Sequence, residues 1–123
     1  EILEPLFAPQ NPVIPVASEA ALNAHFAICA LVPGVLDILA TGADWLAAQT
    51  GDRAGAEYFT TQLMTGFLGA LDPARTHVLA EERDALATEG TLSLMMVNGM
   101  RDGATDATRR ALDAIGQRLE AAT

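Results

Sequence analysis

From residue 18 onward, apolar residues recur at intervals of three and four, the spacing of one face of an α-helix. The longest apolar run is FAICALVPGVLDILA, residues 26–40, and only Pro33-Gly34 and Asp37 interrupt it. Ser18 is a good N-cap, so we predict a first helix that begins there and is broken or kinked at Pro33-Gly34. Pro33 can open a second helix, which we expect to run through Gly42 and to end near Gly51.

A third helix is predicted from about residue 52 to residue 71. Phe59, Leu63, Phe67 and Ala70 mark one stripe along it. Three glycines in this segment each cost about 1 kcal/mol of helix propensity relative to Ala. They indicate either tight packing against another helix or fraying of the helix ends. These glycines are Gly55, Gly66 and Gly69.

Two further boundaries divide the rest of the chain. Asp72-Pro73 is typical of a helix start, and Gly90 of a helix end, so we predict a fourth helix over about 73–88. Its inward positions would be Val78, Leu79, Ala85 and Leu86. Residues 91–102 are apolar on all sides, which favours a short buried helix over a strand that enters an Asn98-Gly99 turn. The last helix is predicted over 105–122 as an ordinary amphipathic one.

Residues 1–17 differ from everything that follows. They carry four prolines and several large apolar residues, so we expect an extended arm rather than a helix. The arm could pack along its own domain, wrap a second copy, or belong to a neighbouring domain. The predicted fold is therefore all-α: a single-domain bundle of five or six helices over 18–123, preceded by an extended, Pro-rich arm over 1–17.

Composition narrows the function classes. A length of 123 residues fits one domain. The formal charge is −9, and all seven basic residues are arginine, which we attribute to codon bias in a GC-rich bacterial genome. An acidic surface repels phosphate backbones, so we expect no nucleic acid partner for this segment.

A membrane partner is also not expected. The apolar run 26–40 has fifteen residues where about 20 are needed to span a bilayer, and Asp37 would be costly there. The first residues lack the basic start of a signal peptide, so we expect a cytoplasmic domain. Cys29 is the single cysteine, and its apolar neighbours indicate a buried free thiol.

His25 and Cys29 lie four residues apart, a spacing at which two side chains on one helical face can hold one metal ion. A zinc site needs three or four ligands, and His77 with Glu81 could supply the others. Nothing in the sequence shows that these helices meet, so we expect core packing and no metal or cofactor. No phosphate-binding glycine motif, nucleophile elbow, HExxH or CxxC occurs.

Candidate ligand contacts come from aromatic and methionine side chains, because Met residues adapt to irregular apolar cavities. Asp37 joins them because a carboxylate among apolar residues is costly unless it is paired or its pKa is raised. The simpler interpretation of Asp37 is a side chain that points to solvent or pairs with an Arg. The candidate pocket residues are Phe26, Asp37, Trp45, Phe59, Met64, Phe67 and Met96.

We predict a non-catalytic helical interaction domain that self-associates, as a homodimer. The reason is an excess of apolar surface on a short chain, for which a second copy is the commonest cover. The alternative is a sensor or regulatory domain that binds a small apolar ligand between helices. An enzyme ranks third and rests only on Asp37, His25 and His77.

Overall fold

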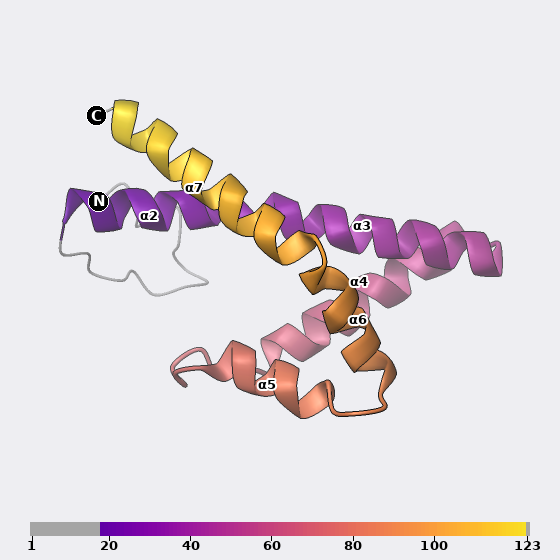
Figure 1. The fold of residues 1–123 in the computed structure, drawn as a ribbon. Helices are drawn as coiled ribbons and strands as arrows, with labels where there is room; N and C mark the ends of the chain where they lie inside the picture. Colours follow the sequence, from indigo (N-terminus) through magenta and orange to yellow (C-terminus); the bar gives the residue numbers. More distant parts are fainter. Residues whose placement is uncertain (1–17, 123) are drawn as a thin grey trace.

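The computed structural model describes residues 18–122, and within this part of the chain every element is a helix. The all-α fold class is confirmed. The predicted arm over 1–17 lies outside the described residues. Six helices follow one another (Figure 1): α2 (Glu19–Cys29), α3 (Leu31–Thr50), α4 (Arg53–Gly69), α5 (Val78–Leu86), α6 (Leu92–Arg101) and α7 (Ala104–Ala122).

α2 and α3 lie nearly end to end and form one long rod (Figure 1). The Ser18 hydroxyl accepts a hydrogen bond from the Ala21 amide at 3.1 Å, which confirms the predicted N-cap. The break predicted at Pro33-Gly34 instead falls at Ala30. Proline lacks an amide hydrogen and its ring crowds the carbonyl four residues earlier, so Pro33 acts on Cys29, where α2 ends. Pro33 itself lies in the first turn of α3, where no amide donor is needed.

α3 and α4 form a helical hairpin. Gly51 closes α3 with a left-handed φ of 74°, and the Asp52 carboxylate caps α4 by accepting from the Gly55 amide at 3.0 Å. The two helices pack more extensively than any other pair in the described chain. Their contact is built from small side chains, since Ala43, Ala47 and Ala56 are buried. α3 runs unbroken through Gly42, as predicted.

The expected reason for the glycines of α4 is not borne out for Gly66 and Gly69. A Cβ at either position would meet nothing within 4 Å, so neither glycine admits a close helix crossing. At Gly55 a Cβ would collide with the carboxylate of Asp52, so this glycine leaves room for the cap.

The fourth helix begins later than predicted. α5 starts at Val78, because Asp72 and Pro73 open a turn in which the Asp72 carboxylate accepts from the Ala74 amide at 3.0 Å. His77, with a left-handed φ of 69°, separates this turn from the helix. α5 packs extensively on no other helix of the described chain. Leu79 and Leu86, predicted to point inward, are 69% and 52% exposed.

The last two helices lie where they were predicted, but α6 is not the buried helix that was expected, since Leu92, Met95 and Met96 are 83%, 70% and 67% exposed. Thr91 caps α6 by accepting from the Leu94 amide at 3.1 Å, so 91–102 contains the short helix and not the strand. α7 packs on α2 and, less extensively, on α6, and it crosses the long rod in Figure 1. Its half-buried apolar face comprises Leu112, Ile115 and Leu119. The array is open, because helices pack in pairs and enclose no common centre among the described residues.

Candidate functional site

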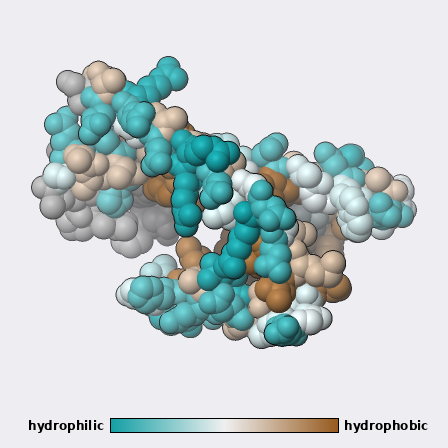
Figure 2. Space-filling view, in the orientation of Figure 1, coloured by the Kyte–Doolittle hydropathy of each residue, from teal (hydrophilic) through white to brown (hydrophobic). Residues whose placement is uncertain are grey.

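The buried core of residues 18–122 consists of four alanines, and the large apolar side chains lie outside it. The buried residues are Ala27, Ala43, Ala47 and Ala56. Single exposed hydrophobic residues are normal on a protein surface, but contiguous apolar patches mark sites of interaction. Figure 2 shows apolar surface that reaches solvent between polar side chains near the centre of the visible face.

The most apolar hollow runs between α3 and α4, and we call it the α3–α4 groove. It has a volume of about 370 Å³. Thr65 is its only lining residue that is not hydrocarbon or thioether. The lining residues are Ile28, Leu31, Val32, Val35, Leu36, Leu39, Met64, Thr65 and Leu68.

The groove continues toward the closed end of the hairpin. A second hollow of about 360 Å³ shares Leu36, Leu39, Met64 and Thr65 with the first and extends to Ala43. Glu57 is the charged residue in its lining. From Ile28 to Ala43 the groove follows fifteen residue steps, or about 22 Å at the rise of an α-helix.

The groove follows from the local sequence. Ile28, Val32, Val35 and Leu39 recur at three and four residues, which puts them on one side of the rod. Alanines on α3 and α4 let the helices approach near the Gly51 turn. Away from the turn, α4 diverges from α3 (Figure 1), so larger side chains line an opening that they do not fill.

Several groove side chains are open to solvent. Val32 is 62% exposed, Leu36 59% and Leu68 48%, whereas Val35, Leu39 and Met64 are half-buried. Leu68 also lines a hollow with Val78 and Leu79, which connects the open end of the groove to α5. The hydrocarbon lining suits an apolar occupant held by burial, with no charged partner required.

Of the predicted pocket residues, Met64 lines the groove. Phe59 and Phe67 form a stripe with Leu63 along α4 that does not line the groove, at 59%, 37% and 57% exposure. Trp45 on α3 and Met96 on α6 are 65% and 67% exposed, and Phe26 on α2 is half-buried. These residues lie on four helices and do not converge on the groove, so their ligand role stays a prediction.

Asp37 is exposed on α3, in agreement with the simpler interpretation that this carboxylate points to solvent. It lies twelve residues from His25 along the rod, which is about 18 Å. His77 precedes α5. The three residues on which the enzyme hypothesis rested therefore form no common constellation within the described chain.

His25 and Cys29 bond to carbonyls of their own helix. His25 Nδ1 lies 2.7 Å from the Ala21 oxygen, and Cys29 Sγ donates to the His25 oxygen at 3.4 Å. Residues 18–122 contain no group of three or more His, Cys, Asp and Glu side chains arranged to hold a metal ion.

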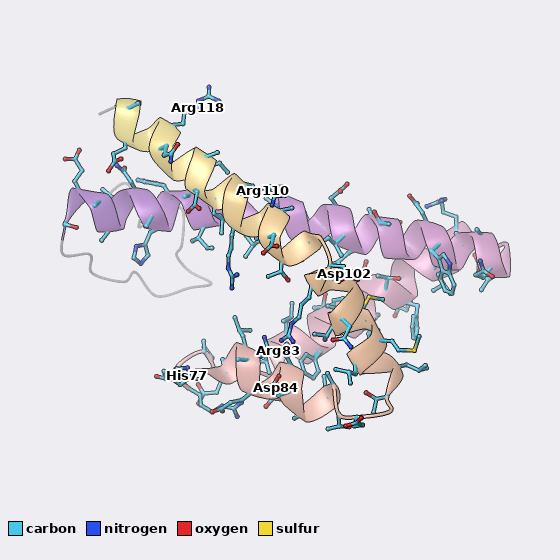
Figure 3. All side chains as sticks on the ribbon, viewed as in Figure 1. His77, Arg83, Asp84, Asp102, Arg110 and Arg118 are labelled. Carbon is cyan, nitrogen blue, oxygen red and sulfur yellow. The ribbon has the colours of Figure 1, made fainter. Side chains whose placement is uncertain are left out.

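Ion pairs lie on the surface, away from the groove. Arg53 Nη1 donates to Asp44 Oδ1 at 2.8 Å across the α3–α4 turn, and Arg75 Nη2 donates to Glu82 Oε2 at 2.9 Å. On α5, Arg83 Nε donates to Asp84 Oδ1 at 2.9 Å (Figure 3). This bond lowers the pKa of Asp84, with a smaller contribution from the charge of Arg101 on α6. These pairs are exposed, so each contributes little to stability.

The long rod of α2 and α3 changes one argument against a membrane partner. Its 32 residues, Glu19–Thr50, are long and apolar enough to cross a bilayer by length and composition, and most of the apolar window is exposed. The argument that the apolar run is too short is therefore wrong, because the helix continues on both sides of 26–40. A core helix or a signal sequence passes the same test. Asp37 and Asp44 remain costly in a bilayer, and the absence of a membrane partner stays a prediction.

Comparison with protein-family models, with curated proteins and with solved structures gives no match for this chain.

Proposed function

We propose that the protein is a non-catalytic helical domain that self-associates as a homodimer through the α3–α4 groove. The observation that carries this proposal is the exposed hydrocarbon lining of the groove beside a core of four alanines. Fully burying a Val, Leu or Ile side chain gains about 1.5–3 kcal/mol. Five groove side chains, Ile28, Leu31, Val32, Leu36 and Leu68, are each 37–62% exposed.

Covering those five side chains gains about 4–7 kcal/mol for one copy and twice that for a two-fold dimer. Association itself costs an estimated 4–15 kcal/mol. One covered groove offsets only the lower part of this range, whereas two offset most of it. A symmetric homodimer therefore suits the groove better than a single apolar contact.

The test compares two variants of one helix by light scattering coupled to size exclusion. Leu36→Glu puts a carboxylate in the groove, and we expect it to convert the dimer to a monomer. Ile38→Glu is the matched control, because Ile38 is 44% exposed and lies about 200° around α3 from Leu36. We expect it to remain dimeric. A wild-type monomer at micromolar concentration, or a dimeric Leu36→Glu, would refute the proposal.

A second candidate function is the binding of a small apolar ligand in the same groove. The volume of about 370 Å³ favours it, since ligand pockets measure about 300–1,000 Å³. Dodecanol is a suitable probe for calorimetry. The ligand hypothesis expects one dodecanol per chain, loss of binding in Leu36→Glu, and a wild-type protein that is monomeric. A dimer that dodecanol leaves unchanged would favour the first function.

A further inference from the structure

α6 carries two apolar faces, and its own chain covers one of them. Leu94, Val97 and Met100 are half-buried on one side of the helix. On the other side, Leu92, Met95 and Met96 are 83%, 70% and 67% exposed. The spacing of these three residues, at i, i+3 and i+4, puts them on one face of the helix. We call this surface the free face of α6.

The free face of α6 and the α3–α4 groove suit each other. α6 has ten residues and is about 15 Å long, and the first hollow of the groove spans about 16 Å along α3, from Ile28 to Leu39. Neither the free face nor the first hollow of the groove contains a charged side chain. Methionine is unbranched and flexible, so Met95 and Met96 can follow the irregular floor between two helices. An amphipathic helix that lies in an apolar groove is a recurrent mode of recognition.

α6 does not fill the groove of its own chain. It packs on α7, and it packs on neither α3 nor α4 to a comparable extent. A second copy supplies an identical α6. We infer that, in the proposed dimer, α6 of each copy docks its free face into the α3–α4 groove of the other. This inference rests on the proposed function and names the surface that occupies the groove.

The area supports a reciprocal exchange. The five exposed groove side chains and the three of the free face are on average about 60% exposed. At about 60–120 Å² of apolar surface for each complete side chain, one groove with its helix buries roughly 300–550 Å². Two contacts bury roughly 600–1,100 Å² of apolar surface. Apolar atoms make up somewhat over half of an interface, so the reciprocal dimer reaches the size of a specific one, and a single contact does not.

The bulky stripe of α4 is a weaker occupant. Phe59, Leu63 and Phe67 are less exposed than the free face of α6, and Tyr58 and Gln62 hydrogen-bond to each other beside them at 3.0 Å. The free face of α6, built from one leucine and two methionines, is the narrower and more adaptable surface.

Complementation of variants in the whole chain tests the exchange by analytical ultracentrifugation. Met96→Glu should weaken self-association at least about 100-fold, because each contact would bury an unpaired carboxylate. Asn98→Glu is the control on α6: Asn98 is exposed and lies about 200° around the helix from Met96. We expect it to dimerise like the wild type. An equimolar mixture of Leu36→Glu and Met96→Glu should form a heterodimer at least about tenfold tighter than either variant alone, because one contact stays intact.

A Met96→Glu protein that dimerises like the wild type, while Leu36→Glu is monomeric, would overturn the exchange. The groove would then meet another groove, and the proposed function would stand. A monomeric wild-type protein would refute both the exchange and the proposed function. Circular dichroism checks that each variant is folded.

Cross-linking provides a measurement that does not depend on introducing charge. In a Cys29→Ser background, the Val32→Cys protein mixed with the Met95→Cys protein should oxidise to a disulfide-linked heterodimer. Val32→Cys mixed with Ser93→Cys should not, because Ser93 is exposed and lies about 200° around α6 from Met95. A disulfide that forms only between two Val32→Cys chains would refute the exchange.

Discussion

The close contact of α3 and α4 depends on alanine, and enlarging one of these alanines should force the hairpin apart. Ala43 on α3 is 2% exposed, and Ala56 on α4 is 3% exposed. Packed helices lie about 8–10 Å apart, and the distance is set by the side chains between them. Ala43→Leu adds three carbon atoms to a buried side chain at the edge of the second hollow, next to the helix contact. Such overpacking typically costs about 1–3 kcal/mol.

For a chain of this length, each kcal/mol shifts the melting temperature by about 3–6 °C. Ala43→Leu should therefore melt about 3–18 °C below the wild type, as measured by circular dichroism at a fixed protein concentration. The concentration is fixed because self-association raises the apparent stability. Ala48→Leu is the matched control: the substitution and the helix are the same, but Ala48 is exposed, so its melting temperature should stay within about 2 °C.

Equal melting temperatures for the two variants would refute the reasoning. α3 and α4 would then not be held by close packing at Ala43, and the groove beside this contact would lose its rigid walls. A large drop in melting temperature in both variants would instead show that leucine at any position of α3 destabilises the protein. The similar helix propensities of Ala and Leu argue against this outcome.

Three further predictions concern turns, charge and caps. Gly51→Ala should destabilise the protein by about 1–2 kcal/mol, because only glycine adopts the left-handed φ at that turn without strain, whereas Gly42→Ala should stabilise it by about 0.5–1 kcal/mol; urea unfolding measures both. Asp84 should titrate below the ordinary pKa of 3.8, and Arg83→Gln should return it to that range, as read by carboxyl NMR shifts. Because the folded-state pKa is lowered, the pair contributes stability above the ordinary pKa and loses it as pH falls through the folded value. Ser18→Ala should cost about 1 kcal/mol and fray the first turn of α2, measured by amide hydrogen exchange.

The sequence predicted the helix ends well where they depend on interactions between residues a few positions apart. Ser18, Asp52 and Thr91 each bond to the amide three residues ahead, so their roles follow from short segments of sequence. Gly51 ends α3 because glycine tolerates a left-handed backbone. The prediction at Asp72 was wrong, because the same carboxylate that caps a helix also closes a turn, and nothing local decides between the two outcomes.

The site was less predictable, because it depends on which face of each helix meets a neighbour. On α4, the small Ala56 and Thr60 lie at helical spacing beside the larger Phe59 and Phe67. Hydrophobicity alone favours the aromatic residues as the inner ones, yet Phe59 and Phe67 are exposed, whereas Ala56 is buried and Thr60 is half-buried. The available signal was the alanine spacing across the Gly51 turn. Short turns make antiparallel neighbours, and small residues then mark the side of close approach.

The choice of small residues for the inner contact has a consequence for the outer surface. α3 and α6 have apolar residues on more than one face, and alanine at the α3–α4 contact covers little of the apolar area. The large side chains must then lie elsewhere, on the walls of the groove and on the free face of α6. A core of leucine would have held the chain together alone. A core of alanine leaves the larger part of the hydrophobic free energy to be gained by association, so folding and dimerisation should be coupled. The melting temperature should accordingly rise with protein concentration in the wild type and become independent of it in Leu36→Glu.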